Sequence, residues 1–76
     1  QREPGMADAW RLLTVAYSRL GRNGETALAQ AEYSMLLGER NQSRVLAERA
    51  MGILPQGSPG WLRAQDIVTQ LDRKKS

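Results

Sequence analysis

Carboxylates that stand near arginines are the residues of this sequence whose types and spacing could do chemistry. Glu32, Glu39 and Glu48 could act as acids and bases. They are scattered rather than clustered, so we interpret them as parts of solvated helix faces. The 76-residue chain contains no His and no Cys, which excludes Ser-His and Cys-His catalytic groups and the usual zinc motifs. The sequence therefore predicts no catalytic, cofactor-binding or metal-ligating residue in this chain.

The basic residues suggest recognition rather than catalysis. Arg11, Arg40 and Arg44 could line a groove that binds a carboxylate-bearing segment. Arg63 and Asp66 stand at positions i and i+3, which predicts an ion pair within one helix. The net charge is +3, but acids alternate with bases along the chain, so we expect no nucleic-acid partner. With Tyr33 as a partly exposed aromatic, the candidate partner-binding residues are Arg11, Tyr33, Arg40, Arg44 and Arg63.

Apolar residues recur at intervals of three and four, which is typical of amphipathic helices. They predict an all-α fold with helices near 6–20, 24–37, 41–54 and 59–72, followed by a basic tail at 73–76. No segment alternates with period two, so strands are not expected. Trp10 and Trp61 lie on apolar stripes, and we expect both in the core. Four alanines would let neighbouring helices approach closely: Ala27, Ala31, Ala47 and Ala50.

Glycine and proline mark the expected helix ends at a constant spacing. The interval from Gly21 to Gly38 equals the interval from Gly38 to Pro55, and we call it the repeat interval. The predicted N-caps are Asn23, Asn41 and Ser58, the last of these before Pro59 in the first turn of its helix. Two such intervals give a helix pair with a period of about 34 residues, which is that of the tetratricopeptide repeat, or TPR. The pattern predicts TPR-like antiparallel hairpins of about four helices in a right-handed superhelical array.

Two segments match halves of the TPR pattern. Trp10, Leu13 and Tyr17 resemble the opening half, W-x2-L-G-x2-Y, with Thr14 at the small-residue position. The segment from Ser43 to Pro55 resembles the closing half. The two matches conflict, because strict alternation would make the first and third helices equivalent. The residues that carry the structural signature are Trp10, Tyr17, Gly21, Gly38, Pro55, Pro59, Trp61 and Asp66.

The sequence also resembles a known family. The Trp10–Tyr17 helix, the segment RLGRNGETALAQAEY and above all LPQGSPGWLRAQDIV are similar to the C-terminal TPR-like region of bacterial HtpX-like zinc metallopeptidases. These are prenyl-protease-related gluzincins, with the BepA type as a familiar member. The resemblance runs from Pro4 to about Leu71. It implies a periplasmic or envelope-associated parent whose zinc and HExxH motif belong to a protease domain outside this chain.

The expected function is that of a non-catalytic interaction module of such an exported metallopeptidase. The chain begins at Gln1 rather than Met, and we expect it to be a C-terminal fragment forming a single domain. Its partners would be protein or peptide segments held in a groove, or the parent's own protease domain. A free-standing TPR adaptor or scaffold is the alternative, and nucleic-acid binding through the basic surface is a third. We expect no membrane insertion, and exposed apolar residues of the first helix could form a homo-oligomer.

Overall fold

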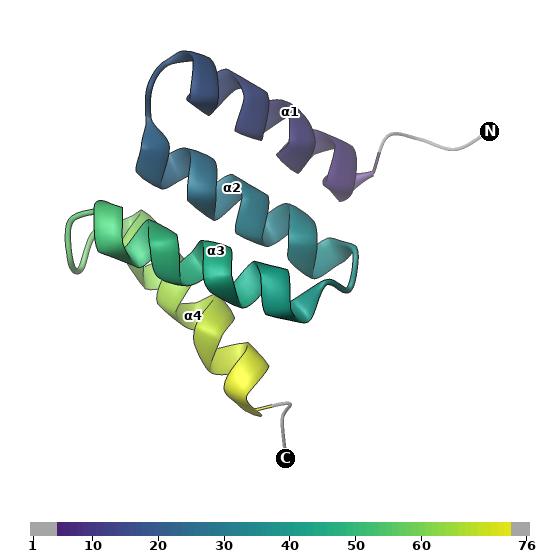
Figure 1. Ribbon diagram of the computed structural model, residues 1–76, viewed down its shortest axis with the longest axis vertical. Coiled ribbons are helices and arrows are strands. Elements are labelled where there is room, and N and C mark those ends of the chain that lie inside the picture. Colours follow the sequence, from purple (N-terminus) through teal and green to yellow (C-terminus); the bar gives the residue numbers. More distant parts are fainter. Residues whose placement is uncertain (1–4, 74–76) are drawn as a thin grey trace.

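The computed structural model describes residues 5–73, and these form four α-helices. They are α1 (Met6–Arg19), α2 (Asn23–Leu36), α3 (Arg40–Ile53) and α4 (Pro59–Arg73). Consecutive helices run antiparallel, with α1, α2 and α3 side by side and α4 behind α3 (Figure 1). The described residues contain no strand, so the all-α prediction is confirmed, and the arrangement is compatible with TPR-like hairpins. Of the predicted basic tail, residues 74–76 lie outside the described part, as does Pro4.

The first two connections are the same turn, repeated after one repeat interval. Gly21 and Gly38 have φ angles of 74° and 79°, a left-handed conformation that costs other residues energy. In each turn the N–H after the glycine bonds back into the preceding helix, from Arg22 to the Tyr17 carbonyl at 3.0 Å and from Glu39 to the Ser34 carbonyl at 2.9 Å. This is the Schellman arrangement, in which glycine ends a helix. Both predicted glycine stops are confirmed.

The predicted asparagine caps are wrong. The N-cap positions belong to Arg22 and Glu39, neither of which makes a side-chain capping bond, and Asn23 and Asn41 lie inside their helices. The reason is the shortness of the turn. The residue after the left-handed glycine both closes one helix and begins the next. Each asparagine therefore comes too late in the chain to cap.

The third connection is longer and behaves as the sequence predicts. Leu54 leaves the helical conformation with ψ at 150° directly before Pro55. The helix that follows starts at Pro59. The Ser58 hydroxyl accepts a hydrogen bond from the Trp61 backbone N–H at 3.3 Å, which is a side-chain N-cap.

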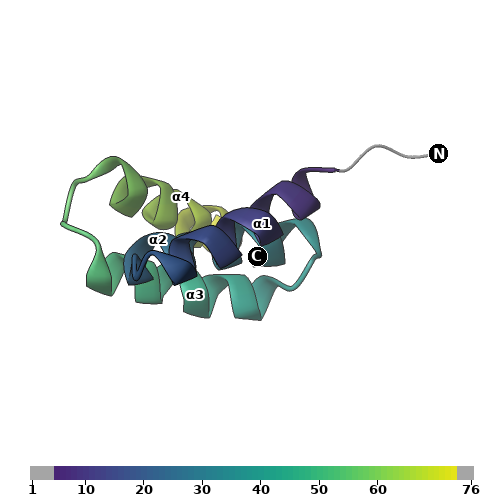
Figure 2. The ribbon, with the colours of Figure 1, turned by 90° about the horizontal axis from the view of Figure 1, so that it is seen from above.

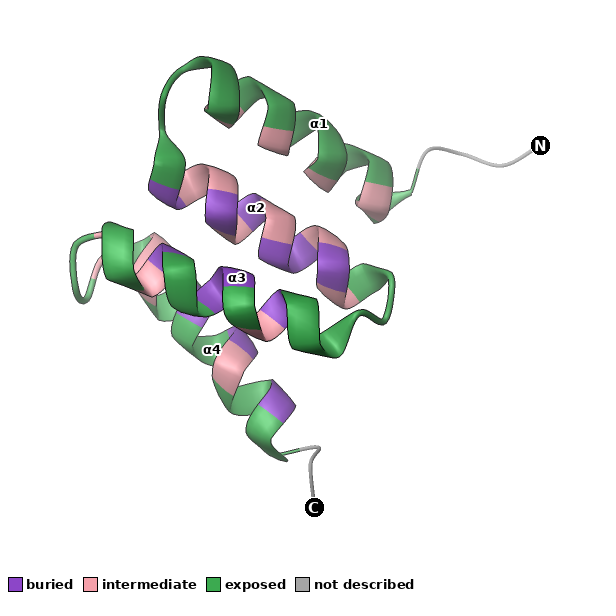
Figure 3. Cartoon of the chain, in the orientation of Figure 1, coloured by how far each residue is buried: buried purple, intermediate pink, exposed green. Residues whose placement is uncertain are grey.

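Alanines dominate the core. The buried apolar cluster lies where α2, α3 and α4 meet, coloured purple in Figure 3, and consists of Ala27, Ala31, Leu46, Ala47, Ala50, Ala64, Ile67 and Leu71. Side chains this small allow helix backbones to pack closely, as predicted. One buried polar contact fixes the approach, because the Ser43 hydroxyl donates to the Ala31 carbonyl at 2.9 Å. The helices are therefore held by close backbone packing more than by large side chains.

The tryptophans do not lie in this core. Trp10 and Trp61 are both only half-buried, and α1 contains no buried residue at all. Trp10 lies on the side of α1 that includes Tyr17, which is half-buried as well. The prediction that both tryptophans belong to the core is therefore wrong. Neither tryptophan belongs to the buried cluster or to the partly buried residues that pack against it.

The helix contacts favour one of the two conflicting repeat phases. The helix α2 contacts both of its neighbours and also α4, whereas α1 contacts only α2 among the described helices. Figure 1 shows α1 at the edge of the array, and Figure 2 shows α3 and α4 displaced from each other along the viewing direction of Figure 1. Helices α2 and α4 thus occupy equivalent positions in the repeat, and α1 and α3 occupy the other position. This agrees with the closing-half match in α3 and disagrees with the opening-half match in α1.

Two helical glycines predict substitution effects of opposite sign. A Cβ at Gly24 would lie 2.6–2.7 Å from the Cδ2 and Cγ of Leu54, whereas a Cβ at Gly52 would meet nothing within 4 Å. We expect Gly24→Ala to lower the free energy of unfolding by about 1–2 kcal/mol through overpacking. Gly52→Ala should raise it by about 0.5 kcal/mol through helix propensity. Urea unfolding followed by circular dichroism measures both; a gain at both positions would contradict the close approach of Leu54 to α2.

Candidate interaction surface

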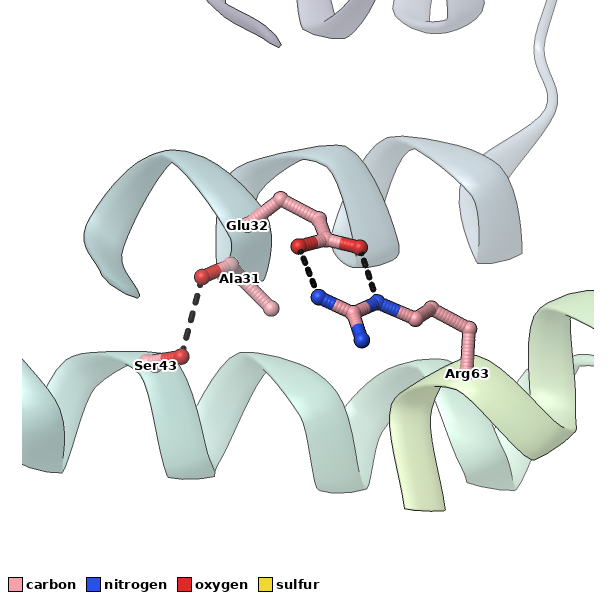
Figure 4. Close-up of polar contacts among 4 residues, drawn as sticks. All are labelled: Ala31, Glu32, Ser43 and Arg63. Atoms are coloured by element: carbon pink, nitrogen blue, oxygen red, sulfur yellow. Dashed lines mark hydrogen bonds and ion pairs between the residues drawn. The ribbon is translucent and has the colours of Figure 1, made fainter. Parts of the chain in front are cut away.

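A two-point ion pair between described residues joins α2 to α4. Arg63 donates two hydrogen bonds to the Glu32 carboxylate, from Nε to Oε2 at 2.5 Å and from Nη2 to Oε1 at 2.8 Å (Figure 4). Glu32 is only 7% exposed, while Arg63 keeps one side towards solvent. A two-point guanidinium–carboxylate contact fixes both position and orientation. This pair therefore sets how α4 lies against α2.

This contact corrects two sequence-based expectations. Glu32 is not on a solvated face, and the ion-pair partner of Arg63 is Glu32 rather than Asp66. The hydrogen bonds to Glu32 raise the pKa of Arg63, and the charges of Glu32 and Asp66 add to this, against a lowering by desolvation. The guanidinium is thus a charged structural clamp. Asp66 contributes only a weaker attraction from an exposed position.

The other candidate arginines do not converge on one groove. Arg44 pairs with Asp72 of α4 at 2.6 Å, and Arg11 approaches Asp8 of its own helix at 4.0 Å. Arg40 is exposed and makes no ion pair with any described residue. Since α1 contacts α2 but not α3, Arg11 lies apart from the helix that carries Arg40 and Arg44, and a groove lined by all three stays a prediction.

Other features of the described part bear on the remaining site predictions. Tyr33 is half-exposed, as expected, and Glu39 and Glu48 are exposed. The described residues enclose no pocket and bring together no group of three potential metal ligands. No described helix combines the length and the apolar character needed to cross a bilayer. Whether Tyr33 or the arginines bind a partner stays a prediction.

A continuous apolar face of α1 is exposed instead. Its larger members are well accessible, Leu12 at 59%, Leu20 at 68% and Met6 at 64%. At 3.6 residues per turn, the residues of this face fall within an arc of about 120° around the helix. Figure 3 shows α1 mostly in the colour of exposed residues and without any buried residue. We call this set the α1 face; it consists of Met6, Ala9, Leu12, Leu13, Ala16 and Leu20, all exposed.

The repeat register shows what the α1 face corresponds to. In α3 the buried residues are Ser43, Leu46, Ala47 and Ala50. Ser43 and its neighbours pack towards α2, as the Ser43–Ala31 bond shows. Counted back by two repeat intervals, the same positions in α1 are Ala9, Leu12, Leu13 and Ala16. These are the positions at which a helix of this array meets the helix before it.

The neighbouring side of α1, centred about 120° around the helix from the α1 face, packs on α2. Ala7, Trp10, Thr14 and Tyr17 are its half-buried residues. One repeat interval later, the same positions in α2 are Gly24, Ala27, Ala31 and Ser34, which are buried. The sequence-based stripe of Trp10, Leu13, Tyr17 and Leu20 therefore splits into a packed and an exposed side. A shift of one repeat interval pairs each position of α1 with its equivalent in α2, but only the packing of α2 shows which of these positions are buried.

The exposed side of α4, at the other end of the array, differs in composition from the α1 face. The outward side of this helix carries the exposed polar residues Gln65, Asp66, Gln70 and Asp72, as predicted for a capping helix, together with one exposed apolar residue, Leu62. Its apolar residues Ala64, Ile67 and Leu71 are buried against the rest of the molecule. The exposed side of the array is thus mainly polar at α4 and mainly apolar at α1.

Comparison of the sequence and structure with models of protein families, with curated proteins and with solved structures gives no match.

Proposed function

We propose that this chain is a non-catalytic protein-interaction module that takes up a helix along the α1 face. The proposal rests on the alignment of α1 with α3 at two repeat intervals. The positions that α3 buries against the preceding helix are occupied in α1 by apolar residues that are exposed. Contiguous exposed apolar side chains mark interaction sites in soluble proteins. A helix laid along α1 would continue the array in the way that each helix packs on the one before it.

The recognition mode differs from the groove expected from the sequence. The arginines that could have bound an acidic segment are partly occupied, since Arg44 and Arg63 hold α4 in place. The α1 face offers apolar contact instead, and each fully covered leucine contributes about 1.5–3 kcal/mol of transfer free energy. An amphipathic helix with apolar residues at intervals of three and four fits such a surface.

The resemblance to HtpX-like metallopeptidases supports a more specific version of the proposal. In that version the module belongs to an exported zinc metallopeptidase in the periplasm, and the helix comes from the protease domain or from a protein substrate. Zinc and the catalytic residues would then belong to the parent. Zinc-dependent cleavage of casein by the isolated 76 residues would refute the non-catalytic role. An HExxH motif encoded upstream of Gln1 would support the metallopeptidase parent, and a nearby start codon would favour a free-standing adaptor.

A chain extension tests whether the α1 face accepts a helix. A copy of residues 6–22 inserted before Met6 adds one helix and one Gly21-type turn at the natural spacing. We expect the free energy of unfolding to rise by about 2 kcal/mol, because the added helix covers Leu12 and Leu13. Urea unfolding at low protein concentration measures the change within one chain.

The matched control changes only the accepting surface. Leu12→Gln and Leu13→Gln in the original α1 leave the inserted helix unchanged and should abolish most of the gain. In the unextended chain the same two substitutions should alter stability little, because both side chains are exposed. An inserted helix that gives no stabilisation, or an equal gain with the glutamines, would contradict the proposed function.

A further inference from the structure

The two ends of the array differ in a way that limits how copies of the chain can associate. Head-to-tail stacking would bring the outward side of α4 onto the α1 face of the next copy. That side carries Gln65, Asp66, Gln70 and Asp72, so it would place polar groups against Leu12 and Leu13. Burying such groups without partners is costly. The α1 face of a second copy therefore matches the α1 face better than the outward side of α4 does.

The order of residues on the α1 face suits an antiparallel pair. Large and small side chains alternate along it as Met6, Ala9, Leu13, Ala16 and Leu20. The order of sizes is the same when the helix is reversed. A two-fold axis near Leu13 would place Met6 opposite Leu20 of the second copy and Ala9 opposite its Ala16. Small residues then face small ones at two points, which lets the helices approach closely.

Charges at the border of the face match the same arrangement. Asp8 and Arg19 lie on one flank of the stripe, next to Leu12 in the helical projection. Reversal about Leu13 brings Asp8 of each copy beside Arg19 of the other. Within one chain Asp8 only approaches Arg11 at 4.0 Å, and Arg19 makes no ion pair with described residues. In a parallel pair the equivalent flanks would lie on opposite sides of the interface, and these charges would not meet.

We propose that two copies of this chain associate through antiparallel packing of α1 on α1 about a two-fold axis. This inference rests on the proposed function and identifies the helix that covers the α1 face as α1 of a second copy. A helix of 14 residues is about 21 Å long, so the interface is at the small end of specific protein contacts. The dimer is thus reversible, with a dissociation constant on the order of 10–100 μM.

Sedimentation equilibrium of the full chain between about 5 μM and about 1 mM tests the dimer, since this range brackets the expected dissociation constant. The natural chain should fit a monomer–dimer equilibrium. Leu13→Gln should weaken it at least about tenfold, because it places amides at the centre of the interface. Leu62→Gln is the matched control on α4, similarly exposed and outside the interface, and should leave the equilibrium unchanged. Circular dichroism verifies that each variant is folded.

A charge exchange tests the antiparallel orientation. Asp8→Arg should weaken association several-fold by setting arginine against Arg19 of the second copy. Adding Arg19→Asp to the same chain should restore it. A chain that stays monomeric to about 1 mM would overturn the dimer, while the extension experiment would still decide whether the face accepts a helix. A dimer that is weakened by Leu62→Gln but not by Leu13→Gln would overturn it as well.

Discussion

An Ile67→Ala variant is expected to lose about 3 kcal/mol of unfolding free energy. Ile67 of α4 is 0% exposed and is the largest fully buried side chain of the described residues. Most of the other residues of the buried cluster are alanines, which have no side-chain freedom with which to fill a cavity. The cavity would therefore remain largely open. A domain of this size has only about 4–11 kcal/mol in total, so the loss is a large fraction of its stability.

Ile53→Ala provides the matched control for this prediction. It removes the same atoms from a side chain of α3 that is 50% exposed, and it should cost about 1 kcal/mol or less. Urea unfolding followed by circular dichroism gives both values. Equal losses at the two positions would show that α4 does not pack on α2 and α3 as described.

An Arg63→Ala variant is expected to lose about 2 kcal/mol, because it leaves the buried Glu32 carboxylate without its partner. The loss is smaller than for a fully buried pair, since Arg63 is partly exposed and water can reach the vacated position. The expected loss should persist at high salt, because buried charges are screened less than surface charges. Urea titrations at two salt concentrations measure it.

Two further variants separate this clamp from an ordinary surface charge. Arg49→Ala removes an exposed arginine of α3 and should change stability by less than about 0.5 kcal/mol. The double variant Glu32→Leu/Arg63→Met removes both charges and should recover most of the loss, because apolar residues of similar size can replace a buried ion pair. If Arg63→Ala and Arg49→Ala had the same effect, the clamp would have no structural role.

Sequence reasoning succeeded where the cause of structure is local. Gly21 and Gly38 end their helices because only the backbone of those few residues is involved, and the left-handed φ favours glycine. Pro55 and Ser58 act through their immediate neighbours in the same way. Each helix begins and ends within one residue of its predicted limits for this reason.

The failures concern contacts between segments distant in the chain. Nothing local to Glu32 indicates that Arg63, much later in the sequence, will fold onto it, so the carboxylate looked solvated. Trp10 is of a residue type common in protein cores, but its helix α1 contacts only α2 among the described helices, and the residue is half-buried. The asparagine caps failed because the turn is shorter than two separate cap positions require.

The α1 face depends partly on local sequence and partly on contacts between distant segments. The apolar residues were visible in the sequence, but which of them pack on α2 depends on the register of the whole array. Once α3 shows which positions meet the preceding helix, the equivalents in α1 follow by counting. The residues of the α1 face are therefore present in the sequence, but that they form an uncovered packing surface could be recognised only from the packing of another helix.

The central claim is that the α1 face is the surface through which this chain associates. Amide NMR spectra of the full chain, recorded from about 20 μM to about 1 mM, test it residue by residue across the expected association range. We predict concentration-dependent shifts confined to α1 and its turns, largest around Leu12, Leu13 and Ala16. Shifts centred on the outward side of α4, or spectra that do not change with concentration, would contradict the claim.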